Sequence, residues 1–145
     1  MSTVSDRELW TCSKCGHAFV TANLWHSCGR FELDDHFRDR PTERRATFDA
    51  FADAVTSCGP VTVYAQKTRI VCQVRVRFGS AYVRRRWIDV ALWLRHRENH
   101  RCLIKVDTYG PKVFMHVYRL ENPADVDDGL RAHIAAAYIV GCQTG

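Results

Sequence analysis

Four residues near the start of the chain combine the types and the spacing of a structural zinc site. Cys12 and Cys15 form a C-x-x-C pair, and His26 and Cys28 form an H-x-C pair at the far end of a short segment. Three thiolates and one imidazole complete a tetrahedral shell, which leaves no position for a water molecule. Because a closed shell is typical of structural sites, the spacing predicts a bound Zn²⁺ that organises this segment.

Other interpretations of the cysteines are weaker. His17 is an alternative to His26 as the nitrogen ligand. A redox C-x-x-C pair belongs in a βαβ pattern that neither flank shows, and a disulfide framework belongs in a secreted chain. The N-terminus has no apolar stretch with a cleavage signature, so we expect a cytoplasmic protein with reduced thiols. We expect the remaining cysteines to be small buried hydrophobes: Cys58, Cys72, Cys102 and Cys142.

The length of the chain, 145 residues, suits one ordinary domain and a small metal module. We expect a zinc-ribbon-like module over residues 1–31 and an α+β domain over residues 32–145. The net charge of +5, carried mostly by arginine, favours anionic partners such as nucleic acid. A GC-rich genome would also enrich arginine without any binding role. No apolar run is long enough to span a membrane.

The order of elements in residues 32–145 predicts two helices and five strands. Pro41 suits the start of a helix, apolar residues recur at helical spacing through Val55, and Gly59 with Pro60 ends it. A second helix begins at Asn122. The strands are expected at residues 61–65, 69–78, 87–94, 102–108 and 112–120. Short connections favour an antiparallel meander, covered on one face by the two helices.

Basic residues and one histidine on the predicted sheet suggest an anion-binding surface. Strand alternation places Arg69, Arg75 and Arg77 on one face, and Lys67 lies just before them. His116 lies on the last strand, on the same face as Tyr118. The ligand-binding candidates are therefore Lys67, Arg69, Arg75 and His116, and the alternative is an ordinary solvated face of an antiparallel sheet.

A second basic group is the run Arg84, Arg85 and Arg86, which Trp87 follows. The guanidinium groups suit a nucleic-acid backbone, and the indole suits stacking on a base. The alternative is a basic loop before a strand whose Trp87 belongs to the core. The sequence lacks serine-elbow, phosphate-loop and H-E-x-x-H signatures, so we expect binding more than catalysis.

Several short motifs in a fixed order carry a resemblance to a known family. They lie at residues 10–16, 25–30, 35–37, 58–63 and 67–70. Together they resemble bacterial members of the domain-of-unknown-function family numbered 5655 that carry an N-terminal zinc-ribbon-like segment. The resemblance runs from about Trp10 to Gly141 and implies an α+β domain without a settled activity.

The resemblance also points to positions of interest in the last strand. Family members tend to have a Pro-Arg-Asn-His-Val-His-His-like stretch there, and in this chain residues 111–117 keep only Pro111 and His116, with a charge at Lys112. If the family histidines bind a metal or ligand, this chain has lost part of that capacity. The resemblance carries over His116, Lys67 and Arg69 as a site.

Three functions follow as hypotheses. The first is a non-enzymatic zinc protein that docks on nucleic acid or a nucleoprotein complex through arginine, with binding that weakens steeply as salt rises. The second is a small anionic-ligand-binding or enzymatic domain, which requires Lys67, Arg69 and His116 to converge on a cavity. The third is a protein-interaction adaptor whose contacts are Trp10 or Trp25.

Overall fold

The computed structural model describes residues 10–11, 18–19 and 32–143, with side chains from residue 32 onward. The first two pieces are β1 (Trp10–Thr11) and β2 (Ala18–Phe19), which pair antiparallel with Trp10 opposite Phe19. The four predicted zinc ligands lie outside the described residues, as does the alternative ligand: Cys12, Cys15, His26, Cys28 and His17.

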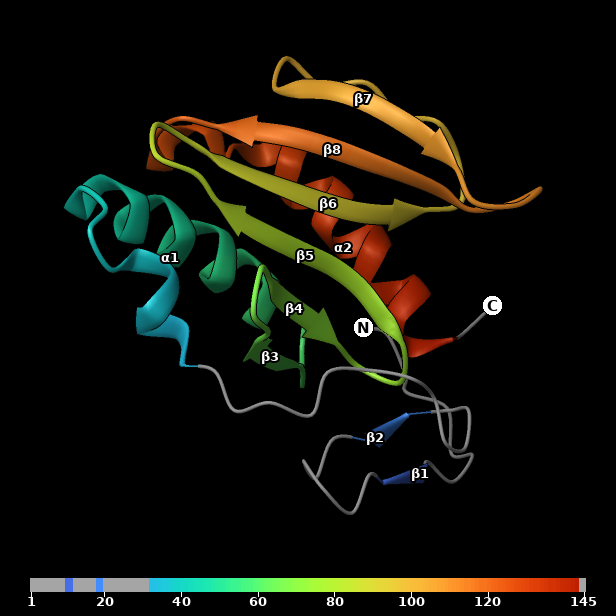
Figure 1. Ribbon diagram of the computed structural model, residues 1–145. Helices are drawn as coiled ribbons and strands as arrows, with labels where there is room; N and C mark the ends of the chain where they lie inside the picture. Colours follow the sequence, from blue (N-terminus) through green and yellow to red (C-terminus); the bar gives the residue numbers. More distant parts are fainter. Residues whose placement is uncertain (1–9, 12–17, 20–31, 144–145) are drawn as a thin grey trace.

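Six antiparallel strands form the main sheet in the order β3-β4-β5-β6-β8-β7 (Figure 1). The strand that follows β6 in the sequence, β7, lies at the edge of the sheet, and β8 lies between β6 and β7. The strands are β3 (Thr62–Ala65), β4 (Ile70–Gln73), β5 (Arg77–Val83), β6 (Ile88–Leu94), β7 (Leu103–Thr108) and β8 (Phe114–Leu120).

Two helices cover one face of this sheet, as the sequence predicts (Figure 1). They are α1 (Thr42–Thr56) and α2 (Asp128–Cys142), and the short 3₁₀ helices η1 (Leu33–Phe37) and η2 (Pro123–Asp125) precede them. The apolar spacing in α1 buries Phe48, Phe51 and Val55. In α2 it buries Leu130 and Ile134. Burial of each such side chain contributes about 1.5–3 kcal/mol, which fixes both helices on the sheet.

The prediction of five strands in a meander is wrong, because the chain turns in the middle of residues 69–78. At residues 74–76 the backbone N–H groups of Arg75 and Val76 donate to the carbonyl of Gly141 in α2, at 2.9 and 3.1 Å. The turn separates β4 from β5, so Arg69, Arg75 and Arg77 are not successive residues of one strand face. The predicted order of neighbouring strands, in which each strand pairs with the next along the chain, is confirmed only from β3 to β6.

The start of the last helix also differs from the prediction. Pro123 lies in η2, and α2 begins at Asp128 after Asp127, whose carboxylate accepts from the N–H of Leu130 at 2.9 Å. A capping carboxylate stabilises a helix N-terminus because it binds a backbone N–H that has no partner inside the helix. Asp127 therefore sets the beginning of α2.

All four cysteines of the domain are free thiols, and their burial differs from the prediction in part. Cys72 and Cys142 are buried, whereas Cys58 and Cys102 are half-buried. Burial raises the pKa of the Cys72 thiol to about 12, so this thiol stays protonated and behaves as a small hydrophobe.

The end of α2 packs closely on β5, and this contact makes a prediction. A methyl group on Gly141 would overlap the Phe78 ring, so Gly141→Ala is expected to lower the free energy of unfolding by about 1–3 kcal/mol. The control is Gly129→Ala in the same helix, where the new atom would lie 3.4 Å from its nearest neighbour, an ordinary contact. Urea denaturation measures both, and equal stabilities would contradict this packing.

Candidate functional site

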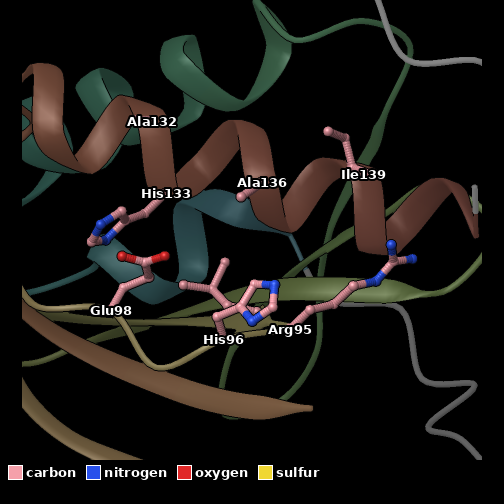
Figure 2. A pocket seen from close by; sticks show the side chains of 8 residues that line it. Arg95, His96, Glu98, Ala132, His133, Ala136 and Ile139 are labelled. Carbon is pink, nitrogen blue, oxygen red and sulfur yellow. The ribbon is translucent and has the colours of Figure 1, made fainter. Parts of the chain in front are cut away.

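A cavity of about 410 Å³ lies between α2 and the segment that follows β6, residues 95–102 (Figure 2). Its volume is within the range of small-molecule sites. The helix contributes one side of the cavity, mostly with small or apolar side chains. The lining residues are Leu94, Arg95, His96, Glu98, Ala132, His133, Ala136 and Ile139.

Behind one end of this cavity, a buried tyrosine on the sheet is hydrogen-bonded to the helix. Tyr118 of β8 is 0% exposed, and its hydroxyl lies 2.8 Å from Nδ1 of His133. Within residues 32–143 this is the only hydrogen-bond partner of that hydroxyl, and a buried O–H without an acceptor is costly. Burial raises the pKa of Tyr118, so the group remains a phenol. Tyr118 therefore donates, and Nδ1 of His133 accepts.

The protonation state of His133 follows from this bond. Burial lowers the pKa of His133, so the ring is neutral near neutral pH. A neutral imidazole carries one proton, and Nδ1 accepts from Tyr118. The proton must therefore lie on Nε2, which makes this atom a hydrogen-bond donor.

His116 holds the backbone of the cavity segment in place. It lies two residues before Tyr118 on β8, is 0% exposed, and stacks on the Tyr118 ring with centroids 6.3 Å apart. Its Nδ1–H donates to the carbonyl of Phe114 at 3.1 Å, and its Nε2 accepts from the backbone N–H of Glu98 at 2.9 Å. Burial lowers its pKa. The neutral ring thus fixes the position of Glu98.

The far end of the segment is attached to the start of α2. Nε2–H of His100 donates to Asp127 at 2.8 Å, and Nδ1 of His100 accepts from the N–H of Cys102 at 3.0 Å. The bond from His100, together with the N–H of Leu130, lowers the pKa of Asp127 to about 2. Asp127 is therefore ionised near neutral pH. Because the segment is held at both Glu98 and His100, the wall of the cavity has a defined position.

Glu98 and His133 supply the polar end of the cavity. Figure 2 shows the Glu98 carboxylate beside the His133 ring, with Arg95 at the opposite end near Ile139. Among the described residues, no salt bridge neutralises the Glu98 carboxylate. The arrangement places a hydrogen-bond donor and a negatively charged acceptor next to each other at the end of a mainly apolar space.

The structure does not bring together the residues that the sequence suggests for an anionic ligand. Lys67 is exposed, and Arg69 lies in the same β3–β4 connection and donates to Gln66 at 2.9 Å. Arg75 is buried at the other end of β4 and donates to Gln143 at 3.2 Å. Three strand spacings, about 14 Å, separate β4 from His116 on β8. Only His116 lies near the cavity.

The arginine run forms an exposed turn between β5 and β6. Arg84, Arg85 and Arg86 are all exposed, and Arg84 pairs with Asp89 at 3.4 Å. The guanidinium of Arg119 lies 4.0 Å from the centre of the Trp87 ring and covers that face of the indole. Stacking of a base on this face would displace Arg119. Nucleic-acid binding by the turn stays a prediction.

The histidines of the site are not arranged as a metal centre. Within residues 32–143 no group of three or more histidine, cysteine, aspartate or glutamate side chains has an arrangement that could hold a metal ion. The ring nitrogens of His100 and His116 are engaged in hydrogen bonds within the protein. In the same residues, neither helix has the length and apolar character needed to cross a membrane.

The α+β domain is similar to a known protein family. The chain matches the family described as Domain of unknown function (DUF5655) over residues 33–140. It belongs to this family. No curated protein and no solved structure gives a significant match.

The DUF5655 match contains the whole cavity and its supporting hydrogen bonds. It begins after the predicted zinc ligands, so it confirms the family resemblance for the domain and leaves the zinc-ribbon-like segment a prediction. The functional interpretation of this DUF5655 domain must come from its own geometry.

Sequence reasoning missed most of the residues that form this site. It identified His116 and its shared face with Tyr118, but not Glu98, His100 or His133. Glu98 and His100 lie in a connection without periodicity. His133 lies beside the apolar stripe of α2, where a polar residue is ordinary. The one available signal was the buried pair on β8, because a histidine and a tyrosine on a core face require polar partners.

Proposed function

We propose that the domain binds a small, largely apolar molecule in the cavity between α2 and residues 95–102. The observation that carries this proposal is the polar end of the cavity, where Glu98 and His133 are both held by buried side chains of β8. A mainly apolar pocket with a few fixed polar groups is the usual form of a ligand site. The group recognised at the polar end would orient the ligand.

Binding requires fewer assumptions than covalent catalysis at this site. The cavity lining within the described residues contains no serine, threonine, cysteine or lysine that could act as a nucleophile. The cavity, rather than the arginine turn, carries the proposal because its polar groups have fixed positions and converge.

Blocking the cavity tests this proposal. Ala136 lines the cavity and is exposed, so Ala136→Phe is expected to fill the space at little cost in stability. We expect benzene derivatives, titrated into the ¹⁵N-labelled full chain, to shift the amide resonances of the lining residues, and Ala136→Phe to weaken this binding at least tenfold.

The matched control is Ala135→Phe, an exposed neighbour on the same helix that does not line the cavity. It should bind like the unchanged protein. Equal binding by both variants, or no shift at the lining residues at millimolar concentrations, would contradict the proposed site.

A structural zinc ion in the N-terminal segment is the second part of the proposal. The spacing of Cys12, Cys15, His26 and Cys28 supports it. The antiparallel pairing of β1 with β2 adds support, because residues 12–17, which include both cysteines of the C-x-x-C pair, connect these two strands. The role of this ion would be structural.

Metal analysis of the untagged protein tests the zinc site. We expect about one zinc ion per chain, as one four-ligand site requires, and its loss in the double variant Cys12→Ser with Cys15→Ser. Cys58→Ser, which changes a half-buried thiol of the domain, should keep the metal. Purified protein with far less than one zinc per chain would refute this part.

A further inference from the structure

The hydrogen-bonding pattern at the polar end of the cavity restricts the chemistry of the ligand. The Tyr118 hydroxyl donates to Nδ1 of His133, and this assignment leaves the ring proton on Nε2. The reverse assignment would leave the buried Tyr118 O–H without an acceptor among the described residues. The tautomer of His133 is therefore set from the sheet behind it, before any ligand arrives.

The neighbouring acceptor is fixed independently. The backbone N–H of Glu98 donates to His116, whose other ring nitrogen donates to the carbonyl of Phe114. His116 therefore needs the opposite tautomer to His133, with its proton on Nδ1. The Glu98 carboxylate can only accept while it is ionised. One end of the cavity thus presents one N–H donor beside one carboxylate acceptor.

We propose that the ligand presents to Glu98 and His133 a neutral group with an adjacent acceptor and donor, for which a carboxamide is the best match. This inference rests on the proposed function of the cavity. The carbonyl oxygen accepts from Nε2–H of His133, and the amide N–H donates to the Glu98 carboxylate. The remainder of the ligand is apolar and packs on Ala132, Ala136 and Ile139 of α2.

Charged groups satisfy only half of this pattern. A carboxylate accepts from His133, but it meets the negative charge of Glu98 and has no proton to donate. An ammonium group donates to Glu98, but it meets the N–H of His133 and cannot accept. Both leave one polar group of the cavity without a partner, and such a loss discriminates strongly between similar ligands.

Three probes of similar size, each a benzene ring with one polar substituent, test the inference: benzamide, benzoate and benzylamine. In titrations of the ¹⁵N-labelled full chain near neutral pH, we expect benzamide to bind at least tenfold more tightly than either charged probe. The shifted amides should be those of the cavity lining. Glu98→Gln removes the negative charge, so it should improve benzoate binding relative to benzamide at least fivefold.

Tyr118→Phe tests the tautomer argument itself. Without the hydroxyl, Nε2 of His133 becomes free to accept, so the preference should move from benzamide toward benzylamine by at least threefold. Tyr82→Phe, which changes a half-buried tyrosine on β5, is the control and should leave the preference unchanged. Thermal unfolding of each variant establishes that it is folded.

The outcomes separate this inference from the proposed function. Binding of benzoate or benzylamine at the cavity as tightly as benzamide would overturn the ligand class, while the cavity would remain a binding site. An unchanged preference in Tyr118→Phe would overturn the role of the tautomer. If none of the three probes shifts the lining residues, both the ligand class and the proposed function fail.

Discussion

The hydrogen bond from Tyr118 to His133 is the interaction on which the rest of the site depends. It crosses from β8 to α2 and joins the buried hydroxyl of Tyr118 to the half-buried ring of His133 at 2.8 Å. Such a bond contributes only about 1 kcal/mol net, but removing either partner leaves the other unsatisfied at a cost of about 1–3 kcal/mol. The core therefore accepts one arrangement of these two side chains, and this arrangement sets the donor in the cavity.

The other polar contacts of the site extend this constraint to the neighbouring segment. His116 stacks on Tyr118 and binds the backbone of Glu98, while His100 attaches the same segment to Asp127 at the start of α2. Each link is short and at least partly buried, so bulk water competes with it less than with a surface ion pair. The contacts between β8, α2 and residues 95–102 therefore determine the form of the cavity. The same contacts determine which polar groups the cavity presents to a ligand.

The sequence predicted the local features of this fold and missed the contacts that depend on topology. Helical spacing identified the buried faces of α1 and α2, and strand alternation placed His116 beside Tyr118. It failed at residues 74–76, where Arg75 lies in a turn fixed by Gly141, because no glycine, proline or asparagine marks that turn. The partners of Tyr118 and His116 lie 15 and 18 positions away, on other elements. Finding them requires the placement of β8 between β6 and β7, which the sequence pattern alone does not specify.

The most direct test of this account is the ring-nitrogen NMR spectrum of the histidines in the uniformly ¹⁵N-labelled full chain near neutral pH. We expect His133 to be neutral, with an unprotonated Nδ1 and a proton on Nε2, and His116 to be neutral with its proton on Nδ1. A His133 ring that is doubly protonated, or that carries its proton on Nδ1, would contradict the central hydrogen bond as it is assigned here.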